Sequence, residues 1–181
     1  DHTNALRFTG VTIPRGVTIA NAHLEIYPGT SPTKGVNLLY QAEASGNSAA
    51  LTTGAKGLSS RAKGVRSANE SPSPFLPGVY NETVELRRVI QEVVNRADWN
   101  SGNALTVFVT DAGSSAGIRN VKAADNGATV APRLVVSYVN IPNPPEFVGD
   151  FDHSIVSGEV FTYEPRAIGT APITYTITET A

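Results

Sequence analysis

The chain has 181 residues and a formal net charge of −2 at pH 7, and this length suffices for one well-buried domain and part of a second, because domains most often hold roughly 100–150 residues. Its basic residues are scattered, and no apolar run approaches the roughly 18 residues of a membrane-spanning helix. The sequence therefore predicts neither a nucleic-acid partner nor a membrane span, and the absence of cysteine excludes disulfides, thiolate metal sites and cysteine nucleophiles.

The first part of the chain predicts three short strands, over residues 5–9, 18–27 and 36–44. In the second and third, apolar residues alternate with polar ones, which is the pattern of a strand with one buried face. The positions expected to face the core are Ala20, Ala22, Leu24, Ile26, Val36, Leu38, Tyr40 and Ala42. We expect the second and third strands to pair as neighbours.

Residues 45–78 form a long stretch in which Gly, Ser, Ala, Asn and Pro dominate. A loop longer than about 15 residues is unusual in a compact domain unless it is functional or held by long-range contacts. We expect Phe75 and Leu76 to anchor its far end to the core.

An amphipathic helix is the clearest element of the sequence, and Thr83 is its expected N-cap. The apolar residues that recur at helical spacing on one face, and so should lie on a sheet, are Val89, Ile90, Val93 and Val94. Turn-forming residues follow over 98–103, where Trp99 is expected to close the core. Residues 104–110 then read as a buried strand.

Two further strands are expected, over 118–124 and 133–139, and the second of them closes a first module that spans 1–139. Residues 140–145 contain three prolines, which favour an extended linker. Residues 146–181 offer strand candidates at 154–156, 160–164 and 173–178. An immunoglobulin-type sandwich needs about a hundred residues, so this second module is expected to be incomplete.

Five motifs follow one another along the first module: ALRFTGVTIPRGVTIANAHLEIY, QAEAS, SSRAK, VIQEVVNRADWNSGNALTVFVTDAG and APRLVVSY. Together they resemble the successive motifs of secreted bacterial β-sandwich modules of the DNRLRE-like, carbohydrate-binding-module type. The resemblance covers roughly Ala5 to Tyr138. The tail over 141–177 is similar to the first half of an immunoglobulin-like (cadherin-like) repeat.

This resemblance implies a mainly β fold, a jelly-roll-like antiparallel β-sandwich with one amphipathic helix, followed by a partial Ig-like β module. Such modules occur in long multidomain proteins that are extracellular or on the cell surface, sometimes beside hydrolases. Modules of this type begin with an additional strand before the ALRF motif, and here the chain starts without it. Their aromatic-rich segment after the SSR motif is also replaced, by VRSANESPSPFLPGVY.

No arrangement of residues predicts catalysis, so we expect no enzyme activity. His2, His23 and His153 stand apart, none at metal-ligand spacing from another histidine, and His23 fits the exposed face of a strand. No G-x-S-x-G turn for a serine nucleophile occurs. Glu25 and Glu43 would be neighbours on paired strands, but nothing marks either of them as a general acid.

The sequence suggests two kinds of binding site. Calcium is bound by oxygen ligands, and Asp111, Asp125 and Asn126 flank two loops that could converge, so a calcium ion is possible there. Sugars stack on exposed aromatic rings. The candidates for stacking are Trp99, Tyr80, Phe75 and Tyr27.

The favoured function is a non-catalytic structural or adhesive module of a secreted or cell-surface protein. The absent first strand would leave a sandwich edge near 5–9 open, so a neighbouring or identical subunit could add a strand there or complete residues 146–181, as in a fibre. The alternative is a carbohydrate-binding module that targets an attached enzyme to polysaccharide.

Overall fold

The structure is a computed structural model that describes residues 3–30, 34–52, 57–113 and 117–140, together with 146–147, 158, 166–168, 173–174 and 176. Two compact units divide where the proline-rich segment begins: Asp1–Val139 and Asn140–Ala181. In the described part of the chain, no helix is long and apolar enough to cross a membrane.

Within the second unit, β10 (Glu146–Phe147) pairs antiparallel with β11 (Ala167–Ile168). The strands predicted over 154–156 and 160–164 lie outside the described residues, and the one over 173–178 lies only partly within them. The Ig-like expectation for this unit stays a prediction.

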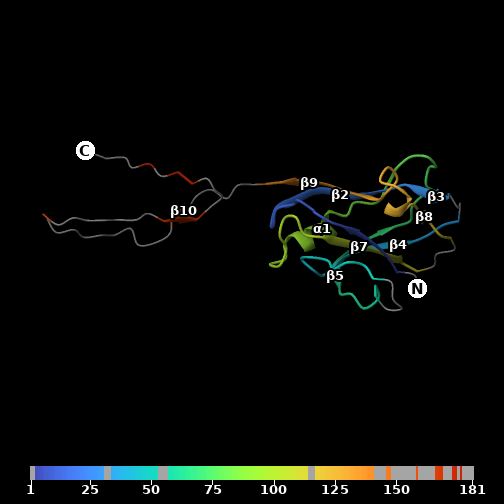
Figure 1. Ribbon diagram of the computed structural model, residues 1–181, viewed down its shortest axis with the longest axis horizontal. Coiled ribbons are helices and arrows are strands. Elements are labelled where there is room, and N and C mark those ends of the chain that lie inside the picture. The colour runs from blue at the N-terminus through green and yellow to red at the C-terminus, as the bar shows by residue number, and fades with distance from the viewer. Residues whose placement is uncertain are drawn as a thin grey trace. The chain divides into compact units, whose positions relative to one another are not determined.

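The first unit is an antiparallel β-sandwich, as the sequence predicted (Figure 1). One sheet has the order β1-β7-β4-β5, formed by β1 (Thr3–Phe8), β7 (Leu105–Asp111), β4 (Leu38–Glu43) and β5 (Lys63–Glu70). The other has the order β6-β2-β9, formed by β6 (Asn81–Glu82), β2 (Thr18–Ile26) and β9 (Arg133–Val139). A small ribbon pairs β3 (Pro28–Thr30) with β8 (Asn120–Val121).

The core lies between the two sheets and is completed by the helix. Fully buried side chains come from β2 (Leu24), β4 (Tyr40), β7 (Val107) and the helix (Ile90), and they belong to one apolar cluster. Removing this apolar surface from water supplies the main stabilising term of the fold.

The alternation predicted for the third strand is confirmed, but that of β2 changes phase in its first half. Ala22 and Leu24 are buried as expected, whereas Ala20 is exposed and Ile19 is buried instead. The pairing of β2 with β9 carries a bulge between Ile19 and Asn21. An extra residue in a bulge moves the preceding side chains to the other face of the sheet.

The prediction that the second and third strands pair is wrong, because β2 and β4 belong to different sheets. The alternation of apolar and polar residues determines which face of a strand is buried, but it does not determine which strand pairs with it. Glu25 and Glu43 are therefore not cross-strand neighbours. Glu43 instead accepts hydrogen bonds from Arg61 (3.1 Å) and from the Ser48 hydroxyl (2.6 Å).

The long segment between β4 and the helix contains β5, a strand that the sequence did not reveal. Few of its residues are apolar, because it lies at an edge of its sheet. The stretch before β5 is held by Arg61, which donates to the carbonyl oxygens of Ala49 and Ala50. Phe75 is 6% exposed and therefore buried as expected, although it lies outside the main core cluster, whereas the prediction for Leu76 is wrong, because Leu76 is 66% exposed.

The helix α1 spans Arg87–Val94, and its predicted buried face is confirmed at all four positions. Thr83 is not its N-cap: the Thr83 amide donates to the Leu24 carbonyl and its hydroxyl accepts from the Leu24 amide, so Thr83 continues the pairing of β6 with β2. Leu86 stands at the N-cap. The Glu85 carboxylate accepts from the Arg87 amide, which has no acceptor within the helix.

Candidate functional site

The helix closes one lateral side of the sandwich by satisfying the backbone edge of β2. Where β6 ends, the amide of Leu86 donates to the Ala22 carbonyl, and Glu85 accepts from the Ala22 amide. Further along β2, the Gln91 side chain accepts from the Ile19 amide (2.8 Å) and donates to the Val17 carbonyl (2.8 Å). These groups replace the partner strand that β2 lacks on this side.

The same helix also closes the edge of β5 in the opposite sheet. The Glu92 carboxylate accepts from the amides of Val65 (2.9 Å) and Arg66 (2.8 Å). Gly64 makes this approach possible, because a Cβ atom there would lie 2.6 Å from Glu92 Oε2. One face of α1 thus packs on the core, and the side chains beside that face form hydrogen bonds with both sheets.

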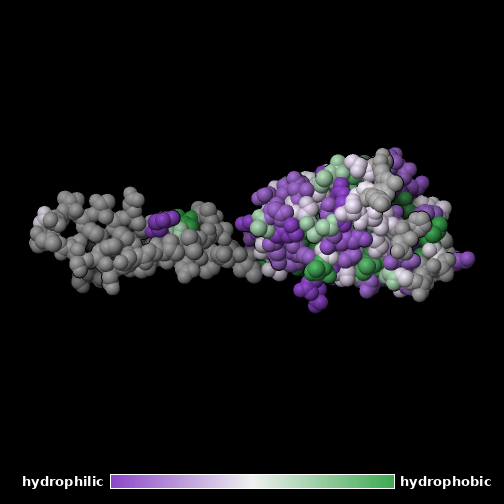
Figure 2. All heavy atoms as spheres, turned by 90° about the horizontal axis from the view of Figure 1, so that it is seen from below, coloured by the Kyte–Doolittle hydropathy of each residue, from purple (hydrophilic) through white to green (hydrophobic). Residues whose placement is uncertain are grey.

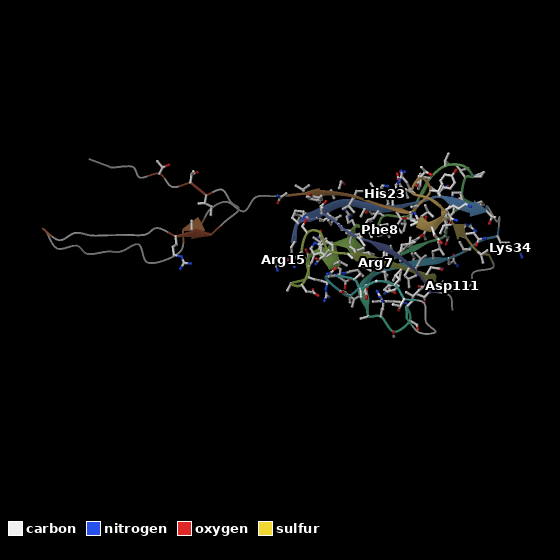
Figure 3. The ribbon with its side chains drawn as sticks, viewed as in Figure 1. Arg7, Phe8, Arg15, His23, Lys34 and Asp111 are labelled. Carbon is white, nitrogen blue, oxygen red and sulfur yellow. The ribbon has the colours of Figure 1, made fainter. Side chains whose placement is uncertain are left out.

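The opposite side of the sandwich is bounded by β1 and β9, the remaining edges of the two sheets. Among the described residues, no strand pairs with the outer edge of either one. Leu6 and Phe8 on β1 (Phe8 and Arg7 are labelled in Figure 3) and Leu134 and Val136 on β9 are only half-buried. Their register partners on β7 and β2 are buried: Leu105, Val107, Ala22 and Leu24.

The backbone of β9 directs two amide groups toward this open side. The amides of Ala22 and Leu24 on β2 donate to Glu85 and Thr83, on the side away from β9. Because backbone groups alternate in direction along a strand, the amide of His23, which lies between them, points toward β9. His23 pairs with Val135 in the register. The amides of Leu134 and Val136 consequently point away from β2, toward the open side. A strand with free amides and half-buried apolar side chains is a template for a further strand.

Exposed apolar residues also occur on β9, where Val135, Tyr138 and Val139 are 37%, 40% and 49% exposed. The face of the first unit seen in Figure 2 is mostly hydrophilic, with hydrophobic side chains scattered among polar ones. Scattered apolar side chains are normal on a protein surface and mark no site by themselves.

The aromatic residues considered for sugar stacking differ widely in accessibility. Trp99 is fully buried and its Nε1 donates to the Ile13 carbonyl (2.9 Å), so it closes the core and offers no ring to a sugar. Tyr27 and Tyr80 pack edge to face with ring centroids 5.5 Å apart. The Arg133 guanidinium lies 4.1 Å over the Tyr80 ring, so protein groups already contact that ring.

Two of the four candidates line one open cleft of about 610 Å³. Phe75 and Tyr80 are joined there by Leu76 and by the carboxylates of Glu70 and Glu82. The Tyr40 hydroxyl donates to Glu70 (2.8 Å), and burial, followed by the Glu70 charge, raises the pKa of Tyr40 well above its usual range. The cleft is therefore partly aromatic and partly acidic, although Phe75 itself is buried.

The residues considered for calcium occupy two separate elements. Asp111 ends β7 and accepts from the Gly113 amide (2.9 Å). Asp125 and Asn126 belong to the 3₁₀ helix η1 (Ala124–Asn126), where Asn126 accepts from the Ala123 amide (2.9 Å). Asp111 and Asn126 thus support their own turns, and the calcium site stays a prediction.

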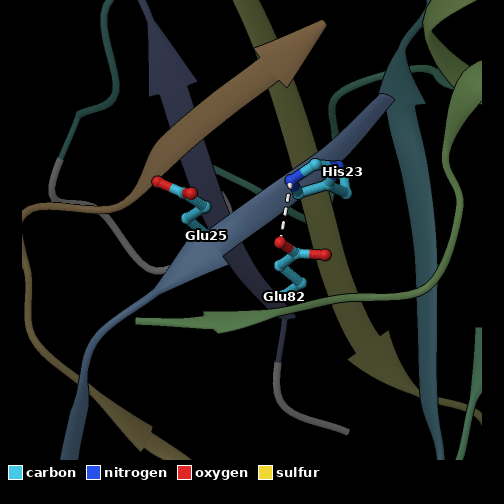
Figure 4. A group of neighbouring side chains, drawn as sticks. All are labelled: His23, Glu25 and Glu82. Carbon is cyan, nitrogen blue, oxygen red and sulfur yellow. Dashed lines mark ion pairs between the residues drawn. The ribbon is translucent and has the colours of Figure 1, made fainter. Parts of the chain in front are cut away.

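A different cluster of possible metal ligands, which the sequence did not suggest, lies on the outer face of the β2 sheet (Figure 4). His23, Glu25 and Glu82 each place one ligand atom within 4.8 Å of the others. In the part of the chain that the structure describes, this is the only group of three or more His and carboxylate side chains with that spacing. It contains neither Asp111 nor Asp125.

Comparison of the chain with protein-family models, curated proteins and solved structures found no match.

Proposed function

We propose that the chain is a non-catalytic structural or adhesive module of an extracellular or cell-surface protein, and that it assembles by accepting a β-strand from a second copy at the side bounded by β1 and β9. The resemblance to DNRLRE-like, jelly-roll modules of multidomain proteins is part of this proposal.

The observation that carries the proposal is the asymmetry of the sandwich. On one side, α1 satisfies the amides of Ile19, Val65 and Arg66 with side-chain oxygens. On the other, the amides of Leu134 and Val136 point outward beside half-buried apolar side chains. A strand added there would gain backbone hydrogen bonds and would bury its own apolar side chains against the core.

The experiment is a concentration series of the full chain, followed by light scattering after size exclusion and by electron microscopy. We expect the average mass to rise with concentration. Val136→Pro removes one outward amide while leaving the pairing of β9 with β2 intact, and it should hold the chain as a monomer. Val136→Ala is the matched control, because it shortens the same side chain and keeps the amide.

The proposal fails if the wild-type chain remains monomeric at every concentration. It also fails if Val136→Pro, shown by circular dichroism to be folded, assembles as readily as Val136→Ala.

A second candidate function is carbohydrate binding, and the specific observation that favours it is the cleft lined by Phe75 and Tyr80. A glycan array with the full chain tests this function. We expect Leu76→Ser, on the rim of the cleft, to weaken any binding. Val65→Ser replaces an apolar residue that is 87% exposed on β5 and should have no effect.

A further inference from the structure

Three side chains with metal-ligand chemistry converge on the outer face of the three-stranded sheet. His23 and Glu25 are two residues apart on β2, so they share the face opposite to the buried Leu24. Glu82 on β6 lies directly across from Glu25 in the register. The strand register therefore places the three residues side by side on one face of the sheet.

Two carboxylates face each other at this position. Glu25 and Glu82 oppose one another across antiparallel strands, an arrangement that is destabilising for like charges. Arg133 pairs with Glu25 at 3.4 Å, and its guanidinium is shared with the Tyr80 ring. Counted without the histidine, the two carboxylates and this one guanidinium leave a net charge of −1.

Neighbouring residues fix the imidazole so that it can accept a cation. The Asn21 amide nitrogen donates to Glu85, which turns Asn21 Oδ1 toward His23. That oxygen lies 3.1 Å from His23 Nδ1, so Nδ1 carries the proton and donates. The other ring nitrogen, Nε2, faces Glu82 and lies 3.9 Å from its Oε1, so it is the nitrogen that a metal ion would bind. The Asn21 amide oxygen thus orients the histidine, as a hydrogen bond to the second ring nitrogen does in metal sites of known proteins.

We propose that His23 Nε2 and one oxygen each of Glu25 and Glu82 bind a Zn²⁺ ion. A nitrogen donor with two carboxylates suits zinc, whereas calcium and magnesium prefer oxygen alone. The side chain of Glu82 is 71% exposed and can move toward the ion. Three protein ligands leave a fourth position for water, and the ion would join the two-residue strand β6 to β2.

The test is isothermal titration of the full chain with Zn²⁺, alongside Ca²⁺ and Mg²⁺. We expect one Zn²⁺ ion per chain and no comparable binding of the other two cations. His23→Gln and Glu82→Gln should each weaken zinc binding by more than about 10-fold, a loss that even a change in a residue hydrogen-bonded to a metal ligand produces. Nitrogen NMR of the imidazole should place the ion on Nε2 of His23.

The matched control is the double variant His2→Gln/His153→Gln, which removes the other two histidines and should bind zinc as the wild type does. The melting temperature supplies a second measurement: zinc should raise it for the wild type but not for Glu82→Gln. In chelator, Glu82→Gln should melt at a higher temperature than the wild type, because it removes the like-charge pair.

Absence of zinc binding, or binding that persists in His23→Gln, would overturn the proposal. A lower melting temperature of Glu82→Gln in chelator would contradict the argument that Glu25 and Glu82 repel one another in the absence of an ion.

Discussion

Replacing Glu92 by alanine tests whether α1 closes the edge of β5. The change removes two charge-assisted hydrogen bonds, from the amides of Val65 and Arg66. Buried bonds to a charged group contribute roughly 1.5–3 kcal/mol each, but these two residues are exposed, so water can replace the carboxylate. We therefore expect about 0.5–1 kcal/mol per bond, and a loss of about 1–2 kcal/mol in the free energy of unfolding.

Gly64→Ala should produce a similar loss by a different route, because the new methyl group would push the Glu92 carboxylate away from β5. If both changes act on the same contact, their effects are not additive, and Gly64→Ala should cost less in the Glu92→Ala background. Urea unfolding followed by Trp99 fluorescence measures each step, since Trp99 is the only tryptophan and is fully buried.

Arg88→Ala is the control for helix propensity, because Arg88 is exposed on the same helix. The reasoning is refuted if Glu92→Ala costs no more than Arg88→Ala. Full additivity of Glu92→Ala and Gly64→Ala would refute it too.

Three further predictions concern the core and the turns around it. Trp99→Phe leaves the Ile13 carbonyl without its donor and should cost about 2–3 kcal/mol in urea unfolding followed by circular dichroism. Gly46→Ala should cost about 3 kcal/mol, because a methyl group would overlap the Asp98 backbone, whereas Gly35→Ala has open space and should be near neutral; equal melting temperatures would contradict this. Burial and Glu70 raise the pKa of Tyr40, so the folded chain keeps a proton that the unfolded chain loses above about pH 10. The resulting stability is fully present below that pH and is lost above it, by up to about 1.4 kcal/mol per pH unit, and Tyr40→Phe should flatten the pH dependence of the unfolding midpoint.

Elements with strong local patterns were predictable from the sequence. Val89, Ile90, Val93 and Val94 identify the buried face of α1 because apolar residues at helical spacing can be buried together only in a helix. Trp99 was rightly expected to close the core, since it is a large apolar residue among turn formers and its burial removes much surface from water.

Features that depend on long-range pairing were not predictable. β5 carries few apolar residues, and the bonds that hold it come from Glu92 on α1. The strand pairing predicted for residues 18–27 and 36–44 was wrong, because the alternation of apolar and polar residues does not indicate which strands pair. The cluster of His23, Glu25 and Glu82 arises from the β2–β6 register, although the i, i+2 spacing of His23 and Glu25 was visible in the sequence.

Amide hydrogen exchange is the most direct test of the claim that the sandwich is closed by α1 and open at β9. In dilute, monomeric protein, the amides of Val65 and Arg66 should exchange slowly, because Glu92 accepts them, while those of Leu134 and Val136 should exchange fast. At concentrations where the chain assembles, Leu134 and Val136 should become protected. Slow exchange of these two amides in the monomer would contradict the account.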